Sequence, residues 1–213
     1  MADAAERPPA TRLLLFGPPG AGKGTQAALL AQRLGIPAIS TGEELRQAVA
    51  GGTELGRRVG SIIAGGALVD DATMAEVVRE RLAQADARVG FLLDGYPRTL
   101  AQAETLEEIL RRQGQALDAA IFLEVPEDEL VRRLSGRQRA DDRKEVVRER
   151  LHVYEKKTAP LVGYYGQRGL LRQIDGNQAV PEVAEAILAA LRPGRAPNRA
   201  RSADAPSFLR SLS

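Results

Sequence analysis

The chain of 213 residues contains no cysteine. This absence excludes disulfide bonds, zinc–thiolate sites and a cysteine nucleophile, and it suits a reducing compartment. The sequence also lacks an apolar run long enough to cross a bilayer, and Met1–Thr11 lacks the apolar stretch of a signal peptide. We therefore expect a cytoplasmic protein with no membrane partner.

The chain also carries little net charge, with a formal value of only +2. The segment 192–213 contains five arginines and one aspartate, so it carries +4 and leaves about −2 for the rest of the chain. The basic balance thus belongs to a terminal segment. We expect no nucleic-acid partner.

Short apolar segments alternate with amphipathic ones along most of the chain. We expect strands at 12–17, 36–39, 89–93, 119–125 and 170–174. We expect helices at 23–34, 42–50, 54–64, 71–85, 100–113, 127–134, 144–157 and 181–191. This alternation predicts an α/β fold in which helices cover both faces of a five-stranded parallel sheet, with ligands bound beyond the carboxyl ends of the strands.

The same pattern predicts how the chain is organised. A disordered lead is expected at 1–11 and a disordered tail at 192–213, with one domain at 12–191 between them. The segments 40–85 and 133–150 do not belong to a minimal five-stranded unit, so we interpret them as two insertions over the same edge of the sheet. The core then comprises 12–39, 86–132 and 151–191.

A glycine-rich loop, Gly-Pro-Pro-Gly-Ala-Gly-Lys-Gly-Thr, lies between the first strand and the first helix. Glycines let several backbone amides converge on a phosphate, and the helix dipole adds to them. The expected phosphate ligands are Gly20, Ala21, Gly22, Lys23, Gly24 and Thr25. Because Gly24 separates Lys23 from Thr25, we expect magnesium to be held through water, with the threonine on a phosphate.

A second signature follows the strand at 89–93, in the sequence Asp94-Gly-Tyr-Pro-Arg98. The carboxylate of Asp94 can orient magnesium-bound water, and the fork of Arg98 suits a phosphate. A strand-end salt bridge between the two residues is the structural alternative. Gln102 lies on the same helical face as Arg98, and its amide can pair with a base.

The first insertion also begins with candidate ligands. Thr41 has the position of a helix N-cap, with Glu44 completing a capping box, and Arg46 follows one turn later. The segment 65–71 is typical of a turn followed by a new helix.

The second insertion is rich in arginine. Its arginines are Arg133, Arg137, Arg139, Arg143, Arg148 and Arg150, with Asp141 and Asp142 among them. Such a run is commonly a solvated surface. Phosphoryl transfer nevertheless needs cations that stabilise charge on the moving group, and a closing flap can supply them while excluding water. The only histidine, His152, has no sequence partner for general-base catalysis.

The Gly-Lys-Gly-Thr loop, the Asp94–Arg98 signature and the arginine-rich segment together resemble the nucleoside monophosphate kinases, and the short-lid adenylate kinase family in particular. The resemblance covers about Leu13 to Leu191. It implies a P-loop three-layer fold, reversible transfer of the γ-phosphoryl group of ATP to AMP with Mg²⁺, a role in adenine nucleotide homeostasis, and a monomer. The insertion 40–85 would bind AMP, and 133–150 would be the lid.

The resemblance also implies residue roles. The residues of the transfer step would be Lys23, Asp94, Arg98, Arg139 and Arg150. Besides the loop, ATP would contact Arg133, Arg137 and Gly176. AMP would contact Thr41, Arg46, Val69, Gly95, Arg98, Gln102, Arg139 and Arg150. Asp70 stands where many short-lid relatives have proline, which predicts a less rigid loop at the AMP base.

Other functions remain open at this point. Kinases of UMP or CMP on the same fold usually carry asparagine where Thr99 stands, so Thr41, Thr99 and Gln102 favour AMP. A non-catalytic adenine nucleotide sensor would not need the complete set of lysine, aspartate and lid arginines. A hydrolytic P-loop ATPase would not need the acceptor-side residues.

Overall fold

The computed structural model describes residues 11–135 and 144–192. Its centre is a five-stranded parallel sheet in the order β2-β3-β1-β4-β5. The strands are β1 (Thr11–Phe16), β2 (Ala38–Ser40), β3 (Gly90–Asp94), β4 (Ala119–Glu124) and β5 (Leu171–Asp175). The predicted α/β fold is confirmed, with strand ends shifted by one or two residues. Thr11, expected in the disordered lead, is the first residue of β1.

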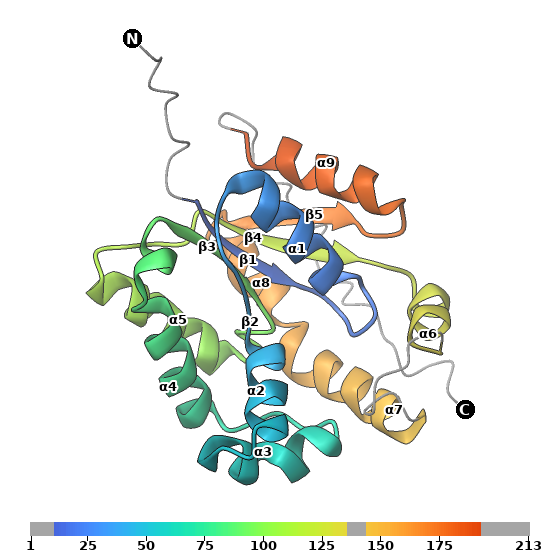
Figure 1. Ribbon diagram of the computed structural model, residues 1–213. Helices are drawn as coiled ribbons and strands as arrows, with labels where there is room; N and C mark the ends of the chain where they lie inside the picture. The colour runs from blue at the N-terminus through green and yellow to red at the C-terminus, as the bar shows by residue number, and fades with distance from the viewer. Residues whose placement is uncertain (1–10, 136–143, 193–213) are drawn as a thin grey trace.

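Helices cover both faces of the sheet (Figure 1). On one face, α1 (Lys23–Leu34) packs against α9 (Val180–Ala190), and on the other α5 (Leu100–Arg112) packs against α8 (Leu161–Gln167). Right-handed crossovers produce this arrangement, because the chain moves one way from β1 to β2 and the opposite way from β3 to β4. The central strands are therefore shielded from water on both sides, and every residue of Leu13–Leu15 and Phe91–Leu93 is 0% exposed.

The segment 40–85 begins with Ser40, the last residue of β2, and then forms three helices. They are α2 (Thr41–Ala50), α3 (Glu54–Ala64) and α4 (Asp71–Leu82), followed by the 3-10 turn η1 (Ala85–Arg88). Side-chain caps begin two of them: the Thr53 hydroxyl accepts from the amide of Gly56 (3.0 Å), and the Asp70 carboxylate accepts from that of Thr73 (2.9 Å). The three helices lie beyond the carboxyl end of β2 (Figure 1).

The predicted single helix at 144–157 is wrong. After α6 (Glu127–Ser135), the described chain resumes with α7 (Lys144–Val153), which passes into the π-helical turn η2 (Tyr154–Thr158) and then α8. Helix α8, which follows Pro160, was not predicted either. Its seven residues are too few to show a clear helical period. None of the helices in 11–135 and 144–192 is long and apolar enough to cross a membrane.

Close contact between α2 and α3 yields a stability prediction. A Cβ atom added to Gly56 would meet the backbone of Ala48 and lie 2.7 Å from the Cα of Val49. We expect Gly56→Ala to lower the free energy of unfolding by about 2 kcal/mol, because overpacking outweighs the gain in helix propensity. Chemical denaturation measures it.

Gly60 is the matched control, since it lies in the same helix and an added Cβ would meet Val49 only at 3.9 Å. Gly60→Ala is expected to be neutral or to stabilise by about 0.5–1 kcal/mol. Equal effects of the two substitutions would show that the α2–α3 contact does not exclude a methyl group at Gly56.

Candidate functional site

Sheet register brings the sequence motifs to one place. Asp94, the last residue of β3, pairs with Leu15 of β1 on one side and with Ser40 of β2 on the other. The glycine-rich loop follows β1, and α2 follows β2. The carboxyl ends of three adjacent strands thus open into a cleft of about 680 Å³.

The glycine-rich loop forms one wall of this cleft. Gly20 and Gly22 have φ angles of +87° and +90°, which side chains disfavour, and Gly22 is the N-cap of α1. The ammonium of Lys23 donates to the carbonyls of Gly17 and Pro18, at 2.9 Å each. The predicted residues that line the cleft are Gly20, Gly22, Lys23, Gly24 and Thr25, whereas Ala21 is buried and does not. The first amides of α1 have no intrahelical partner and form an anion site.

Arg98 lies opposite the loop, held by its own backbone turn. Its Nε donates to the carbonyl of Gly95 (2.8 Å). Burial lowers the pKa of Arg98, Asp94 opposes that shift, and the charges of Arg150 and Arg46 add to it. Within the described residues Asp94 and Arg98 form no ion pair, so the structural alternative of a strand-end salt bridge is wrong. Three cationic side chains therefore act on one another here, which favours a bound anion.

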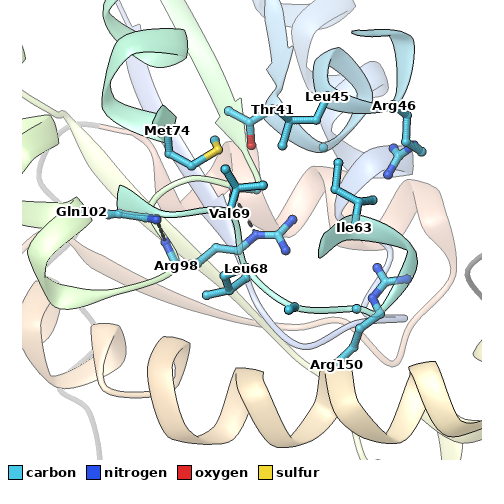
Figure 2. Close-up of a pocket in the computed structure, with 14 residues that line it drawn as sticks. Thr41, Leu45, Arg46, Ile63, Leu68, Val69, Met74, Arg98, Gln102 and Arg150 are labelled. Atoms are coloured by element: carbon cyan, nitrogen blue, oxygen red, sulfur yellow. Dashed lines mark hydrogen bonds between the residues drawn. The ribbon is translucent and has the colours of Figure 1, made fainter. Parts of the chain in front are cut away.

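Arg98, Arg46 and Arg150 also line a smaller pocket beside the cleft (Figure 2). Five apolar side chains line the same pocket, those of Leu45, Ile63, Leu68, Val69 and Met74. Gln102 and Thr41 supply polar groups among these side chains. In Figure 2, Val69 and Met74 lie toward Gln102, and Arg46 and Arg150 lie toward the opposite end. This arrangement fits a planar ring attached to a phosphate.

The predicted capping role of Thr41 is wrong. The N-cap of α2 is Ser40, no side chain caps that end, and Thr41 is the first helical residue. Its hydroxyl instead donates to the carbonyl of Asp94 (3.4 Å). Gly95 makes room for this contact, because it has a φ of +87° and an added Cβ would lie 2.9 Å from the Thr41 oxygen. Thr41 thus joins α2 to the end of β3.

The turn before α4 contains hydrogen bonds made by Asp70 itself. One carboxylate oxygen of Asp70 accepts from the amide of Thr73, and the other accepts from its hydroxyl (2.8 Å). These hydrogen bonds lower the pKa of Asp70. The carboxylate therefore fixes the turn through hydrogen bonds where a proline would restrict the backbone, and Val69 beside it is 6% exposed.

Sequence reasoning missed two carboxylates that hold predicted arginines. Glu129 accepts from Nε of Arg133 (2.5 Å), whose Nη2 donates to the carbonyl of Gly176 (3.1 Å). Glu43 accepts from Nη2 of Arg46 (2.7 Å). Both pairs have i, i+3 or i, i+4 spacing on a helix, and that spacing was the available signal. The structure thus brings Arg133 and Gly176 together, two residues that are both expected to contact ATP.

Of the other predicted lid residues, only some lie in the part of the chain that the structure describes. Arg150 on α7 lines both the cleft and the smaller pocket. Arg137, Arg139, Asp141 and Asp142 lie outside the described residues.

Two predicted residues near the metal line the cleft: Asp94, expected to orient magnesium-bound water, and Thr25, expected on a phosphate. Asp94 is 9% exposed. Within residues 11–135 and 144–192, no three His, Cys, Asp or Glu side chains gather as metal ligands. A divalent cation would fit here with most of its ligands taken from water and phosphate oxygens.

Comparison with known proteins gives a consistent result. A family model described as adenylate kinase matches residues 15–170. Adenylate kinase of Moorella thermoacetica is 50% identical over 211 residues, covering 84% of this chain and 97% of that protein. Those of Thermobifida fusca and Leptospira biflexa are 51% and 46% identical, covering 85% and 83% of this chain and 98% and 97% of theirs. The chain therefore belongs to the adenylate kinase family.

Proposed function

We propose that this protein catalyses the reversible transfer of the γ-phosphoryl group of ATP to AMP, giving two ADP, and so balances the adenine nucleotides. One observation carries the proposal: a phosphate loop and a pocket with one apolar and one cationic end share a wall at Arg46, Arg98 and Arg150. A donor at the loop and an acceptor in the pocket would place their phosphates toward the same three arginines. An ATPase would have no use for the second pocket.

The chemistry needs no covalent intermediate. In-line transfer between two phosphates spreads negative charge over the equatorial oxygens, and catalysis consists of positioning and electrostatic stabilisation. Lys23 and the first amides of α1 bind the donor phosphates. The acceptor phosphate is bound by Arg98, Arg46 and Arg150. These arginines also stabilise the charge that develops between the donor and acceptor phosphates. Their like charges repel one another, and a bound anion relieves that repulsion.

Mg²⁺ is the proposed cofactor, with Asp94 holding it through water and Thr25 nearby on a phosphate. When bound, it neutralises charge on the donor phosphates. The side chains present fit that role, because a buried carboxylate and a hydroxyl line the cleft at the loop.

The two insertions are proposed to move. Segment 40–85 would close over AMP, and 133–150 would close over ATP, in a family that is a standard example of lid closure. Arg137 and Arg139 would then reach the phosphates. Closure excludes water and so prevents hydrolysis of ATP.

We further propose a monomeric, cytoplasmic enzyme that acts on free nucleotides and binds neither nucleic acid nor membranes. The absence of cysteine and the near-neutral charge outside 192–213 support this assignment. Light scattering is expected to give a mass near 22.9 kDa.

The test is a panel of acceptors with ATP and Mg²⁺. AMP and dAMP are expected to be used, and CMP, UMP and GMP to be poor. UMP preferred over AMP would make the protein a pyrimidine monophosphate kinase. Binding of both ATP and AMP without ADP formation would make it a sensor. The name of the relatives, adenylate kinase, favours AMP as the acceptor.

Glu129 gives a prediction for the donor side. Hydrogen bonds from Arg132 and Arg133 lower the pKa of Glu129 to about 2, so this carboxylate is charged at neutral pH. Glu129→Gln weakens the hold on Arg133, which we place against ATP. We expect the KM for ATP to rise about 3–10-fold, from loss of one charge-assisted hydrogen bond. The kcat and the KM for AMP should stay within about twofold of wild type.

Arg132 supplies the control, because it pairs with the same carboxylate but its side chain is 75% exposed. Arg132→Gln is expected to leave the KM for ATP unchanged. A matching rise in both variants would mean that Glu129 acts through general surface charge and not through Arg133.

A further inference from the structure

The side-chain amide of Gln102 is held at both ends. Gln102 is 2% exposed. Its Oε1 accepts from the backbone amide of Arg98, and its Nε2 donates to Oδ1 of Asp71, at 2.7 Å each. Figure 2 shows the hydrogen bond between Gln102 and Arg98 at the edge of the pocket. Two segments that are far apart in the sequence therefore meet at one amide.

The chemistry of the partners fixes which end of the amide faces which. A backbone N–H can only donate, and an ionised carboxylate can only accept. A rotated amide would place two donors face to face at Arg98 and two acceptors face to face at Asp71. Each mismatch leaves a polar group unsatisfied, which is costly where the amide is buried.

Thr99 adds to the connection. Its hydroxyl accepts from the backbone amide of Gln102 (3.1 Å) and lies 3.4 Å from both carboxylate oxygens of Asp71. These contacts join the N-terminal ends of α4 and α5 at Gln102, which lines the end of the pocket that we propose for the base. The position of Asp71 is thus defined relative to Gln102.

An amide fixed in this way has one N–H and one lone pair left for a ligand. The edge of a 6-aminopurine offers the complementary pair, an acceptor at N1 and a donor at N6. A 6-oxopurine offers the reverse, a donor at N1 and an acceptor at O6. A 6-oxopurine would be read only by the rotated amide, which Asp71 and Arg98 oppose.

We propose that Asp71 is a positioning residue that fixes the amide of Gln102 in the orientation that accepts a 6-aminopurine and rejects a 6-oxopurine. This inference rests on the proposed function, in which Gln102 contacts the base of AMP. It makes base selectivity a property of a carboxylate that does not itself line the pocket.

The test compares kcat/KM for AMP and for IMP, which differ only at the N1–C6 edge, with ATP and Mg²⁺. Asp71→Ala is expected to lower the AMP-to-IMP ratio about tenfold, since one of the two constraints on the amide is lost. Asp71→Asn can present either its oxygen or its N–H to Gln102, so it no longer opposes the rotated amide and is expected to lower the ratio as Asp71→Ala does. In a Gln102→Leu background, Asp71→Ala should change the ratio no further.

Asp70→Ala is the matched control, because it removes the neighbouring carboxylate, which caps α4 and does not contact Gln102. It is expected to lower the thermal midpoint and leave the ratio unchanged. An unchanged ratio in Asp71→Ala, or the same change in the Gln102→Leu background, would overturn the proposal for Asp71. Failure of the wild-type protein to form ADP from ATP and AMP would instead overturn the proposed function.

Discussion

Lys23→Met is expected to lower kcat about 10³-fold, the upper end of the effect of removing one preorganised charge donor. The ammonium is held at 2.9 Å from two carbonyls of its own loop, so it is positioned at the donor phosphates before a nucleotide arrives. Its interaction strengthens as charge develops on the moving phosphoryl group. The loss should therefore fall on kcat more than on the KM for ATP.

The fold should tolerate this change. Lys23 lies at the wall of an open cleft, so the carbonyls of Gly17 and Pro18 can bind water in its absence. We expect the thermal midpoint to fall by no more than about 4 °C, which corresponds to about 1 kcal/mol in a chain of this size. Differential scanning calorimetry and steady-state rates with ATP and AMP measure the two effects.

Lys157→Met is the control, because Lys157 is exposed in η2 and does not line the cleft. Its rate should equal that of wild type. A Lys23 variant with normal kcat and only a raised KM for ATP would show that the lysine contributes uniform binding, and its role in the transfer step would have to be abandoned.

The sequence predicted the sheet and most helices because their signals are local. Strands buried on both faces are continuous apolar runs, and the bounds of α1 and α3 were predicted without error. The break at η2 was not visible, because a single π-helical turn occupies only five residues, and the seven residues of α8 are too few to show a helical period.

The same distinction applies to the site. The glycine-rich loop and the Asp94–Arg98 signature were found because each occupies a few consecutive residues between a strand and a helix. Asp71 was not found as a partner of Gln102, since the two are 31 residues apart and meet only when α4 packs against α5. The contact of Thr41 with Asp94 likewise depends on sheet order.

Arg98→Ala is expected to impair use of the acceptor and to lower kcat/KM for AMP by at least about 10³-fold. Arg98 lines both the cleft and the smaller pocket, so its guanidinium would lie between the two proposed phosphate sites. Its backbone is fixed as well: the amide donates to Gln102, and the carbonyl accepts from the hydroxyl of Thr158 (2.9 Å). The KM for ATP should stay within about threefold of wild type, because the donor phosphates bind mainly at Lys23 and the loop.

Without nucleotide, the same variant should not be strongly destabilised. Burial and the charges of Arg150 and Arg46 oppose the charged form of Arg98, so its removal relieves an unfavourable interaction while Gly95 loses one hydrogen bond.

Arg172→Ala is the control: Arg172 also donates to backbone carbonyls, those of Gly169 and Leu171 at 3.0 Å, but does not line the cleft. It should cost stability and leave AMP kinetics intact. Unaltered AMP kinetics in Arg98→Ala would refute the assignment, and equal losses toward ATP and AMP would make Arg98 a residue of the transfer step alone. The expected result, a loss confined to AMP in a folded protein, follows only if the cationic end of the pocket exists to bind the acceptor phosphate.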